Sequence, residues 1–264
     1  MNLRTFAERC SRNLQFRRRL PGAYGGHVIW TSPDARLRYL RPGVAAFDQE
    51  LLQTARNFVR PGQIVIDVGA NVGEFAVAAC HFAGPKGAVL AIEPDPFLCA
   101  LLHRTIAEPG NSELPLDALC AAIADKEQLV PFLIASRGRA SNALAGYGLA
   151  TMGAVRGRFI APVLTIDAVA KQWRAPDFIK IDVEGAELLA LQGAGQTLAQ
   201  HRPLIFVEVT TQHDSVYKLF RSASYKLFAP ALSGEVAEIS RCEFNTLAVP
   251  EEKIAILKSG GGMR

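Results

Sequence analysis

The alternation of apolar and polar stretches along the chain predicts a sheet of buried strands separated by helices. Continuous apolar runs at 64–68, 88–92 and 204–209 are typical of strands that are buried on both faces of a parallel sheet. The stretch 48–59 instead repeats its apolar residues at helical spacing, with Asp48 in a capping position at its start. Strand, helix and strand in this order predict a right-handed parallel α/β unit.

The α/β alternation is interrupted in the middle of the chain. A third strand is expected over 116–124. The stretches 128–135 and 158–166 then predict a strand pair around a Gly- and Ser-rich connection. We expect a β-hairpin or lid insertion over the site, in which Asn142 and Tyr147 either face a substrate or have no role.

The two ends of the chain differ from this pattern. Helical spacing of apolar residues from Leu3 to Leu14, followed by Arg17-Arg18-Arg19, predicts a basic flanking or lid segment. A basic helix that binds a membrane surface or RNA is the alternative. The expected division of the chain is therefore a basic segment at 1–45, an α/β domain at 46–258 and a flexible tail at 259–264.

Composition places the chain among ordinary globular proteins. Of its 264 residues, 49% are hydrophobic and 20% are charged, which suffices for a full core. The net charge of +4 is too mild to argue for a nucleic acid by itself. No apolar run reaches transmembrane length, and the start lacks the apolar stretch of a secretory signal. Five cysteines without a Cys-x-x-Cys pair are expected to be reduced, as in a cytoplasmic protein, and the oligomeric state is left open.

Candidate chemistry begins where the first buried strand ends. Asp67 is followed by Gly69, Asn71 and Gly73, residues that tolerate positive φ and let a ligand approach the backbone. Such a βα turn at the carboxyl edge of a sheet is typical of a nucleotide-type site. The two phosphate-binding spacings, Gly-x4-Gly-Lys-Ser/Thr and Gly-x-Gly-x-x-Gly, are absent from the sequence, and Glu74 and Asp67 would repel an anion here. The site therefore favours a cofactor with positive charge and no phosphate, and S-adenosylmethionine fits.

Two further acids follow the next strands. Glu93 comes directly after the strand at 88–92, where an acid can accept both hydroxyls of a ribose. Asp125 follows the expected third strand and is placed either to accept from the adenine amino group or to form a turn.

A second charged motif spans Lys180-Ile181-Asp182-Val183-Glu184-Gly185-Ala186-Glu187. Alternation along a strand places Lys180, Asp182 and Glu184 on one face, directed at the same crevice as the glycine turn. Because three charges on an inner strand are costly unless they are paired or lie at an open end, this motif is expected at the active site. Lys180 can pair with either acid and keep it ionised. Glu187 falls in the first turn of the next helix, where an acid is favoured in any case.

The ordered combination of these motifs resembles the FkbM family of S-adenosylmethionine-dependent methyltransferases. The similarity rests on 66–73, on Ile92-Glu93-Pro94, on 179–187 and on Val207-Glu208-Val209, and covers about residues 45–250. It implies a class I methyltransferase (Rossmann-like) fold, with a mostly parallel seven-stranded sheet and helices on both faces. It also implies methyl transfer to a hydroxyl, often of a sugar, glycan or natural product.

The resemblance implies cofactor contacts from the 67–73 loop and Glu93, and acceptor contacts from the 180–187 motif. For methyl transfer to an alcohol, Asp182 is the first candidate base and Glu184 the second. A divalent metal held by such acids is an alternative way to acidify the hydroxyl. An RNA methyltransferase guided by the basic N-terminus and a non-catalytic nucleotide-binding module are the alternative functions.

Overall fold

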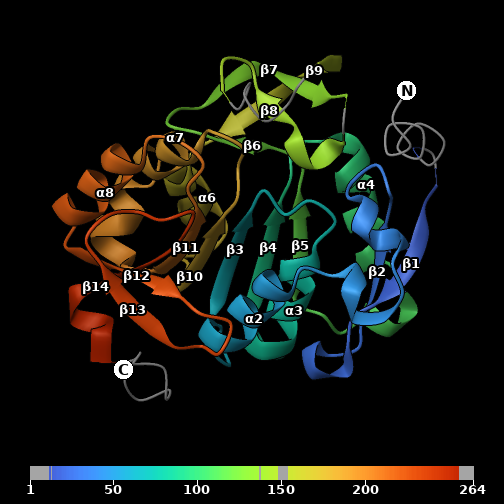
Figure 1. Cartoon of the computed structure of the whole chain (residues 1–264), viewed down its shortest axis with the longest axis horizontal. Helices are drawn as coiled ribbons and strands as arrows, with labels where there is room; N and C mark the ends of the chain where they lie inside the picture. Colours follow the sequence, from blue (N-terminus) through green and yellow to red (C-terminus); the bar gives the residue numbers. More distant parts are fainter. Residues whose placement is uncertain (1–11, 13, 137, 148–153, 256–264) are drawn as a thin grey trace.

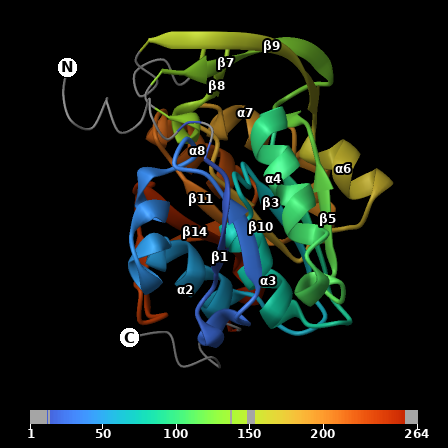
Figure 2. The ribbon, with the colours of Figure 1, turned by 90° about the vertical axis from the view of Figure 1, so that its right-hand side faces the viewer.

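The computed structural model describes residues 12, 14–136, 138–147 and 154–255. These residues form an α/β fold with a large sheet in the centre, helices on both of its faces, and a smaller sheet above the ends of the central strands (Figure 1). The view in Figure 2 shows the same smaller sheet lying across the top of the central strands and helices. The expected tail at 259–264 and nearly all of the expected helix at 3–14 lie outside the described residues.

The large sheet has eight strands rather than the expected seven. Its order is β13-β12-β14-β11-β10-β3-β4-β5, and the five neighbouring strands from β11 to β5 pair in parallel. Since β14 is antiparallel to both of its neighbours, β12 runs in the same direction as these five strands, and β13 runs against it. The additional strand β13 pairs with β12 at the edge, where its half-exposed residues show no apolar run that could have revealed it. The strands are β3 (Ile64–Val68), β4 (Ala88–Ile92), β5 (Leu116–Leu119), β10 (Phe178–Ile181), β11 (Leu204–Glu208), β12 (Tyr225–Pro230), β13 (Val236–Ile239) and β14 (Asn245–Pro250).

Helices cover both faces of this sheet, as expected for strands that are apolar on both sides. Ile179 and Ile181 belong to one buried cluster, whereas Phe178 belongs to the cluster on the opposite face, which confirms the predicted alternation in β10. The capping role expected of Asp48 is also confirmed, because its carboxylate accepts a hydrogen bond from a backbone N–H of the first helical turn, and Asp95 caps the next helix but one in the same way. One face carries α2 (Gln49–Phe58), α3 (Glu74–Ala83) and α4 (Pro96–Ile106); the other carries α6 (Ile166–Gln172), α7 (Glu187–Gln192), a π-helical turn (Thr197–His201) and α8 (His213–Ser222).

The smaller sheet is built by the insertion that interrupts the α/β alternation. Its order is β6-β9-β7-β8, and the antiparallel pairing of β7 with β9 confirms the expected strand pair. The expected third strand at 116–124 is divided, because the chain leaves the large sheet after Leu119 and joins the smaller one. The strands are β6 (Ala122–Ile123), β7 (Gln128–Ala135), β8 (Ala143–Leu144) and β9 (Val155–Leu164).

The described part of the N-terminal segment packs on the face that carries α2 and α3. Arg17, Arg18 and Arg19 lie in β1 (Phe16–Arg19), which pairs with β2 (Val28–Thr31), so this basic run is a strand rather than a helix. Ile29 and Tyr39 are buried in the same cluster as α2 and α3. The remaining short turns are Gly22–Tyr24, Leu37–Leu40, Gly43–Ala46, Pro109–Asn111, Arg139–Ser141 and Glu251–Lys253.

Candidate active site

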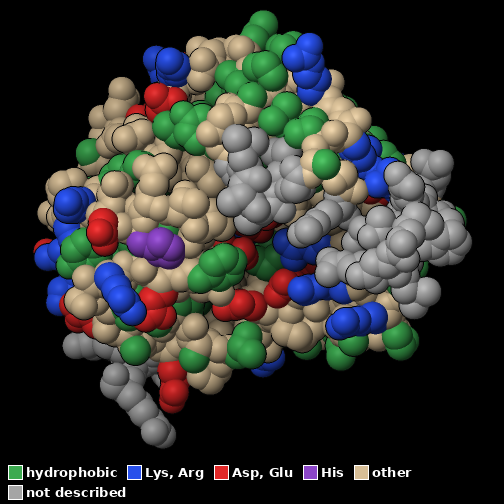
Figure 3. All heavy atoms as spheres, turned by 45° about the horizontal axis from the view of Figure 1, so that its top comes forward, with side chains coloured by type: hydrophobic (Ala, Val, Ile, Leu, Met, Phe, Trp, Pro, Cys, Tyr) green, Lys and Arg blue, Asp and Glu red, His purple; other side chains and the backbone are tan. Residues whose placement is uncertain are grey.

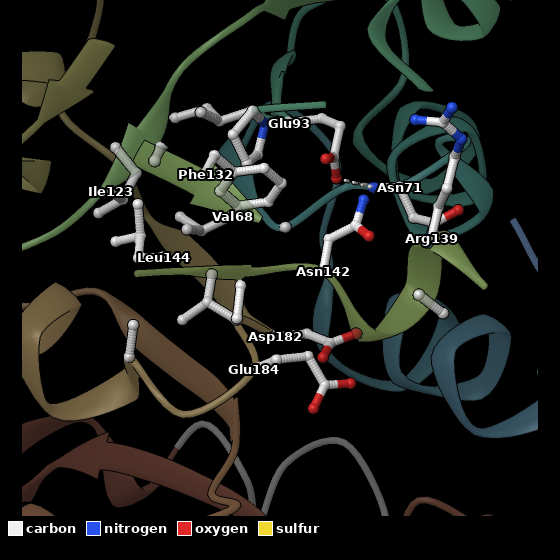
Figure 4. Close-up of a pocket in the computed structure, with 18 of the residues that line it drawn as sticks. Val68, Asn71, Glu93, Ile123, Phe132, Arg139, Asn142, Leu144, Asp182 and Glu184 are labelled. Carbon is white, nitrogen blue, oxygen red and sulfur yellow. Dashed lines mark hydrogen bonds between the residues drawn. The ribbon is translucent and has the colours of Figure 1, made fainter. Parts of the chain in front are cut away.

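A cavity lies at the carboxyl ends of β3, β4 and β10, below the smaller sheet, and encloses about 620 Å³ including its open mouth. In Figure 4 its apolar residues gather on one side, and its polar side chains lie on the other side and along the bottom. The apolar side is formed by Val68, Ile92, Ile123, Phe132 and Leu144; the polar residues include Arg36, Asn71, Glu93, Arg139, Asn142, Asp182 and Glu184.

The glycine turn after β3 has the backbone conformation that its sequence predicts. Gly69, Asn71 and Gly73 all have positive φ, at 76°, 54° and 84°. Gly69 and Asn71 line the cavity. The side of Gly69 that would bear a Cβ faces the backbone carbonyl of Asp182, and that of Gly73 faces Leu102. Both glycines therefore serve close packing within the protein, and Gly73 does not line the cavity.

Glu93 lies in the cavity wall with its carboxylate held in place by backbone groups. Its Oε2 accepts a hydrogen bond from the Asn71 N–H at 2.9 Å, drawn in Figure 4, and its Oε1 accepts one from the Asp95 N–H at 2.9 Å. Burial raises the pKa of Glu93 to about 8, although these two hydrogen bonds act in the opposite direction. Because each carboxylate oxygen can accept a second hydrogen bond, Glu93 is equipped to receive a pair of hydroxyls.

A buried cation joins the two motifs. The Lys180 Nζ lies 3.2 Å from Asp67 Oδ1 and 3.4 Å from Asp182 Oδ2, and it donates to the Gly69 carbonyl at 3.0 Å. Burial acts to lower the pKa of Lys180, but the two carboxylates outweigh it and raise this pKa. Asp67 is fully buried below the loop, so Lys180 and Asp67 act as the support of the loop and of Asp182.

The N-terminal segment contributes a residue that the sequence patterns did not indicate. Arg36 lines the cavity; it donates to Asp48 Oδ2 at 3.2 Å, and its second amino group lies 3.7 Å from Asp182 Oδ2. Next to it, Glu74 at the start of α3 is buried and accepts hydrogen bonds from the Tyr39 hydroxyl and the Asp48 N–H. The helix N-terminus is therefore occupied by a carboxylate, as its sequence predicted.

The insertion is attached to the cofactor side of the sheet by a network of charged groups. Arg139 pairs with Asp34 at 2.7 Å and with Asp95 at 2.5 Å, and Asn142 donates to the same Asp95 oxygen at 2.7 Å. Asn142 lines the cavity, whereas Tyr147 does not. Since Asp95 also holds Glu93, the network connects the insertion to the candidate ribose acid.

Two further acids stand near Asp182. Glu184 lines the cavity beside it, and Figure 4 shows both side chains at the bottom of the cavity. Glu208 ends β11, next to β10, and lines an adjoining open groove that shares Arg36 with the cavity. Burial raises the pKa of Glu208 to about 7, and the negative charge of Asp182 adds to this. Glu187, in contrast, accepts from Gly185 N–H and the Thr210 hydroxyl, as expected for a helix-start acid.

Asp125 is not brought into the cavity. The division of the expected third strand sends Ala122 and Ile123 into the cavity wall, and Asp125 follows them into an exposed turn. The structure therefore gives no support to a contact between Asp125 and the adenine amino group.

The part of the chain that the structure describes bears on two remaining questions, a bound metal ion and a membrane span. Within it, no group of three or more His, Cys, Asp or Glu side chains is arranged to hold a metal ion. Within the same residues, none of the helices combines the length and the apolar character that crossing a bilayer requires.

Comparison with known proteins identifies the family. The family model described as "Methyltransferase FkbM domain" matches residues 67–227, which is more than half of the chain and includes both motifs. The chain belongs to the FkbM methyltransferase family. Membership implies methyl transfer from S-adenosylmethionine.

Individual relatives of this FkbM family member are distant. A ribosomal RNA large subunit methyltransferase E from Alkalilimnicola ehrlichii is 33% identical over 79 residues, which are 30% of this chain and 38% of that relative. A methyltransferase FkbM from Methylobacillus flagellatus KT is similar in structure, with a TM-score of 0.48, 17% identity, and coverage of 78% of this chain and 51% of that chain. An S-adenosylmethionine-dependent O-methyltransferase from Thermotoga maritima has a TM-score of 0.45 and 10% identity, covering 84% and 72% of the two chains. The chain thus spans about half or less of the first two of these relatives.

The cavity of this FkbM protein fits the cofactor that the family implies. Gly69 and Asn71 bring the backbone of the glycine turn to the cavity wall, where a ligand can approach it. Glu93 offers acceptors for a diol, and the apolar side offers a surface for a flat base.

Proposed function

We propose that this protein transfers the methyl group of S-adenosylmethionine to a hydroxyl group of a sugar, glycan or natural-product small molecule. The observation that carries the proposal is that one cavity contains both a candidate cofactor-binding acid and candidate catalytic carboxylates. The candidate ribose acid Glu93 lies in its wall, and the carboxylates of Asp182 and Glu184 lie at its bottom. A hydroxyl acceptor needs such a carboxylate because its proton must be removed.

On the cofactor side, the roles follow from the contacts of each residue. Glu93 would accept hydrogen bonds from the two ribose hydroxyls, held in place by the N–H groups of Asn71 and Asp95. Phe132 and Leu144 would cover the base from the apolar side. When it is bound, the cofactor supplies an activated methyl group on a sulfonium. The protein's main contribution is then to hold the acceptor in line, which can supply about 7–11 kcal/mol.

On the acceptor side, we propose that Asp182 is the base that removes the proton of the acceptor hydroxyl. Its carboxylate lies between the cations Lys180 and Arg36, at 3.4 and 3.7 Å, which fix its position at the cavity. A base positioned in this way contributes roughly 10²–10⁴-fold to the rate. Glu184 is the alternative base from the same loop, and Lys180 serves catalysis by holding Asp182.

The test is a screen of hydroxyl-bearing sugars, glycans and polyketide-like alcohols with S-adenosylmethionine labelled in its methyl group. We expect label in an ether product, which resists alkaline hydrolysis, together with stoichiometric S-adenosylhomocysteine. Glu93→Ala is the control that should abolish transfer at low cofactor concentration. Label found only in esters or in amines would overturn O-methylation of a hydroxyl. Binding of the cofactor without release of S-adenosylhomocysteine with any acceptor would instead indicate a non-catalytic nucleotide-binding module.

An RNA acceptor is the second candidate. It is favoured by the similarity to a ribosomal RNA methyltransferase and by Arg17 and Arg19, whose side chains are exposed on β1. Arg17 is partly neutralised by Glu108 at 3.7 Å. If RNA is the acceptor, binding should weaken steeply as salt is raised. Failure to bind structured RNA at low salt would remove this candidate.

A further inference from the structure

S-adenosylmethionine ends in an amino acid, so its site must satisfy a carboxylate as well as a nucleoside. This requirement rests on the proposed use of that cofactor. Anions in partly buried sites are held by backbone N–H groups or by cationic side chains. The candidates are therefore the hydrogen-bond donors of this cavity that are not already engaged within the protein.

The backbone of the glycine turn is already engaged. The N–H groups of Gly69 and Ala70 both donate to the Ile92 carbonyl, at 2.9 and 3.0 Å. The N–H of Asn71 donates to Glu93. These three consecutive groups tie the end of β3 to the end of β4 and cannot also hold a carboxylate.

Two arginines are the cationic residues that line the cavity within the described part of the chain. Arg139 is committed to structure: its Nε and one amino group bind Asp34 and Asp95, and its guanidinium stacks over Phe97 at 4.3 Å. Figure 4 shows its side chain running away from Asp182 and Glu184. It serves the nucleoside end of the cavity through Asp95 and Glu93.

Arg36 is differently placed. It lines the cavity, and it also lines a small adjoining pocket together with Gly69, Asn71 and Asp182, directly against the turn. The Nη1 amino group of its guanidinium donates to Asp48. The Nη2 amino group lies 3.7 Å from Asp182, beyond hydrogen-bond distance. Within the described residues, Arg36 uses one of its five N–H donors in a hydrogen bond, which leaves the others to be assigned. Its side chain is 23% exposed, so a charge held there is only partly screened by water.

The charge of Arg36 is maintained by its neighbours. Burial acts to lower its pKa, but the surrounding Tyr39, Asp182, Glu74 and Asp48 outweigh this and raise it. Figure 3 shows acidic and basic side chains side by side near the middle of the face turned to the viewer, a surface suited to a zwitterion.

We propose that Arg36, which lies outside the matched family domain, binds the amino-acid carboxylate of the cofactor and so completes the site. The N-terminal segment then has a direct function in cofactor binding. Binding of the carboxylate can be distinguished from a purely structural role of Arg36. If Arg36 binds the carboxylate, its substitution should weaken only ligands that carry this group.

The test compares two ligands by titration calorimetry. S-adenosylhomocysteine carries the amino acid, whereas 5′-methylthioadenosine has the same nucleoside and thioether without it. A charged hydrogen bond contributes about 1.5–3 kcal/mol, so Arg36→Gln should weaken S-adenosylhomocysteine by about 10- to 150-fold. Binding of 5′-methylthioadenosine should change by less than about threefold, which also shows that the variant is folded. Glu93→Gln should weaken both ligands.

Arg38→Gln is the matched control, because Arg38 also pairs with Asp48, at 2.7 Å, but does not line the cavity. It should leave both affinities unchanged. Arg36→Gln that weakens both ligands equally, or that leaves S-adenosylhomocysteine within about threefold of wild type, overturns the assignment. If wild-type protein binds neither ligand, the proposed function itself fails, and this outcome is distinct from a failure of Arg36 alone.

Discussion

Gly69 provides a prediction that needs no knowledge of the acceptor. A Cβ added to Gly69 would lie 1.8 Å from the backbone carbonyl oxygen of Asp182, whereas one added to Gly73 would meet only the flexible end of Leu102, at 2.5 Å. Both glycines have similar positive φ, 76° and 84°. Alanine in that conformation costs about 1–2 kcal/mol at either position. The difference between the two variants therefore isolates the clash with the backbone.

The free-energy cost of the clash can be calculated from the hydrogen bonds that must break. Separating the two strand ends breaks the hydrogen bond from Asp182 N–H to the Val68 carbonyl and the one from Lys180 to the Gly69 carbonyl, both 3.0 Å long. These contribute about 0.5–1.5 and 1.5–3 kcal/mol. Together with the strained φ, Gly69→Ala should lower the free energy of unfolding by about 3–6 kcal/mol, and Gly73→Ala by about 1–3 kcal/mol.

Urea denaturation of both variants measures this difference through the midpoint, provided that the m-value is unchanged. S-adenosylhomocysteine binding should be lost in Gly69→Ala and largely kept in Gly73→Ala. If the two variants unfold within about 1 kcal/mol of each other, the close approach of the strand ends is not the reason for glycine at position 69. If Gly69→Ala does not fold while Gly73→Ala does, the prediction holds in its strongest form.

Five further outcomes are expected. Glu93→Gln should bind S-adenosylhomocysteine about tenfold or more weakly by calorimetry, since an amide NH2 replaces one of the two oxygens that would accept the ribose hydroxyls. Because burial raises the pKa of Glu93 to about 8, ionisation of Glu93 destabilises the fold. The contribution of protonated Glu93 to the free energy of unfolding is complete below about pH 4.5 and is lost as the pH rises to about 8. Glu93→Gln should therefore gain stability relative to wild type between pH 5 and pH 9 in urea titrations, and a constant difference would contradict this. Asp182→Asn should lower single-turnover methyl transfer by about 10²–10⁴-fold, and a rate within about threefold of wild type would remove Asp182 as the base. In thermal-shift assays NAD should stabilise the protein far less than S-adenosylhomocysteine, because Glu74 occupies the helix N-terminus. If a divalent ion assists the reaction, a chelator should inhibit wild-type turnover and excess ion should restore it.

Features that depend on neighbouring residues were determined by the sequence itself. The apolar runs of β3, β4 and β11, the positive-φ turn from Gly69 to Gly73, and the cap Asp48 all follow from local periodicity and local backbone preference. Glu93 was located in the same way, because the carboxyl ends of parallel strands meet at one edge. The combination of motifs was also sufficient to indicate the family.

Features that depend on contacts between distant segments were decided only by the tertiary structure. No period relates Arg36 to Asp182, and their approach depends on how the N-terminal segment packs against α2 and α3. The same holds for Gly69, whose missing side chain makes room for the carbonyl oxygen of Asp182, just beyond the end of β10. The choice between the two alternatives for Asp125 was open for a related reason: an apolar run shows that a strand exists, but not that it leaves one sheet for another at Leu119. Local patterns specify elements, and the packing of those elements specifies the site.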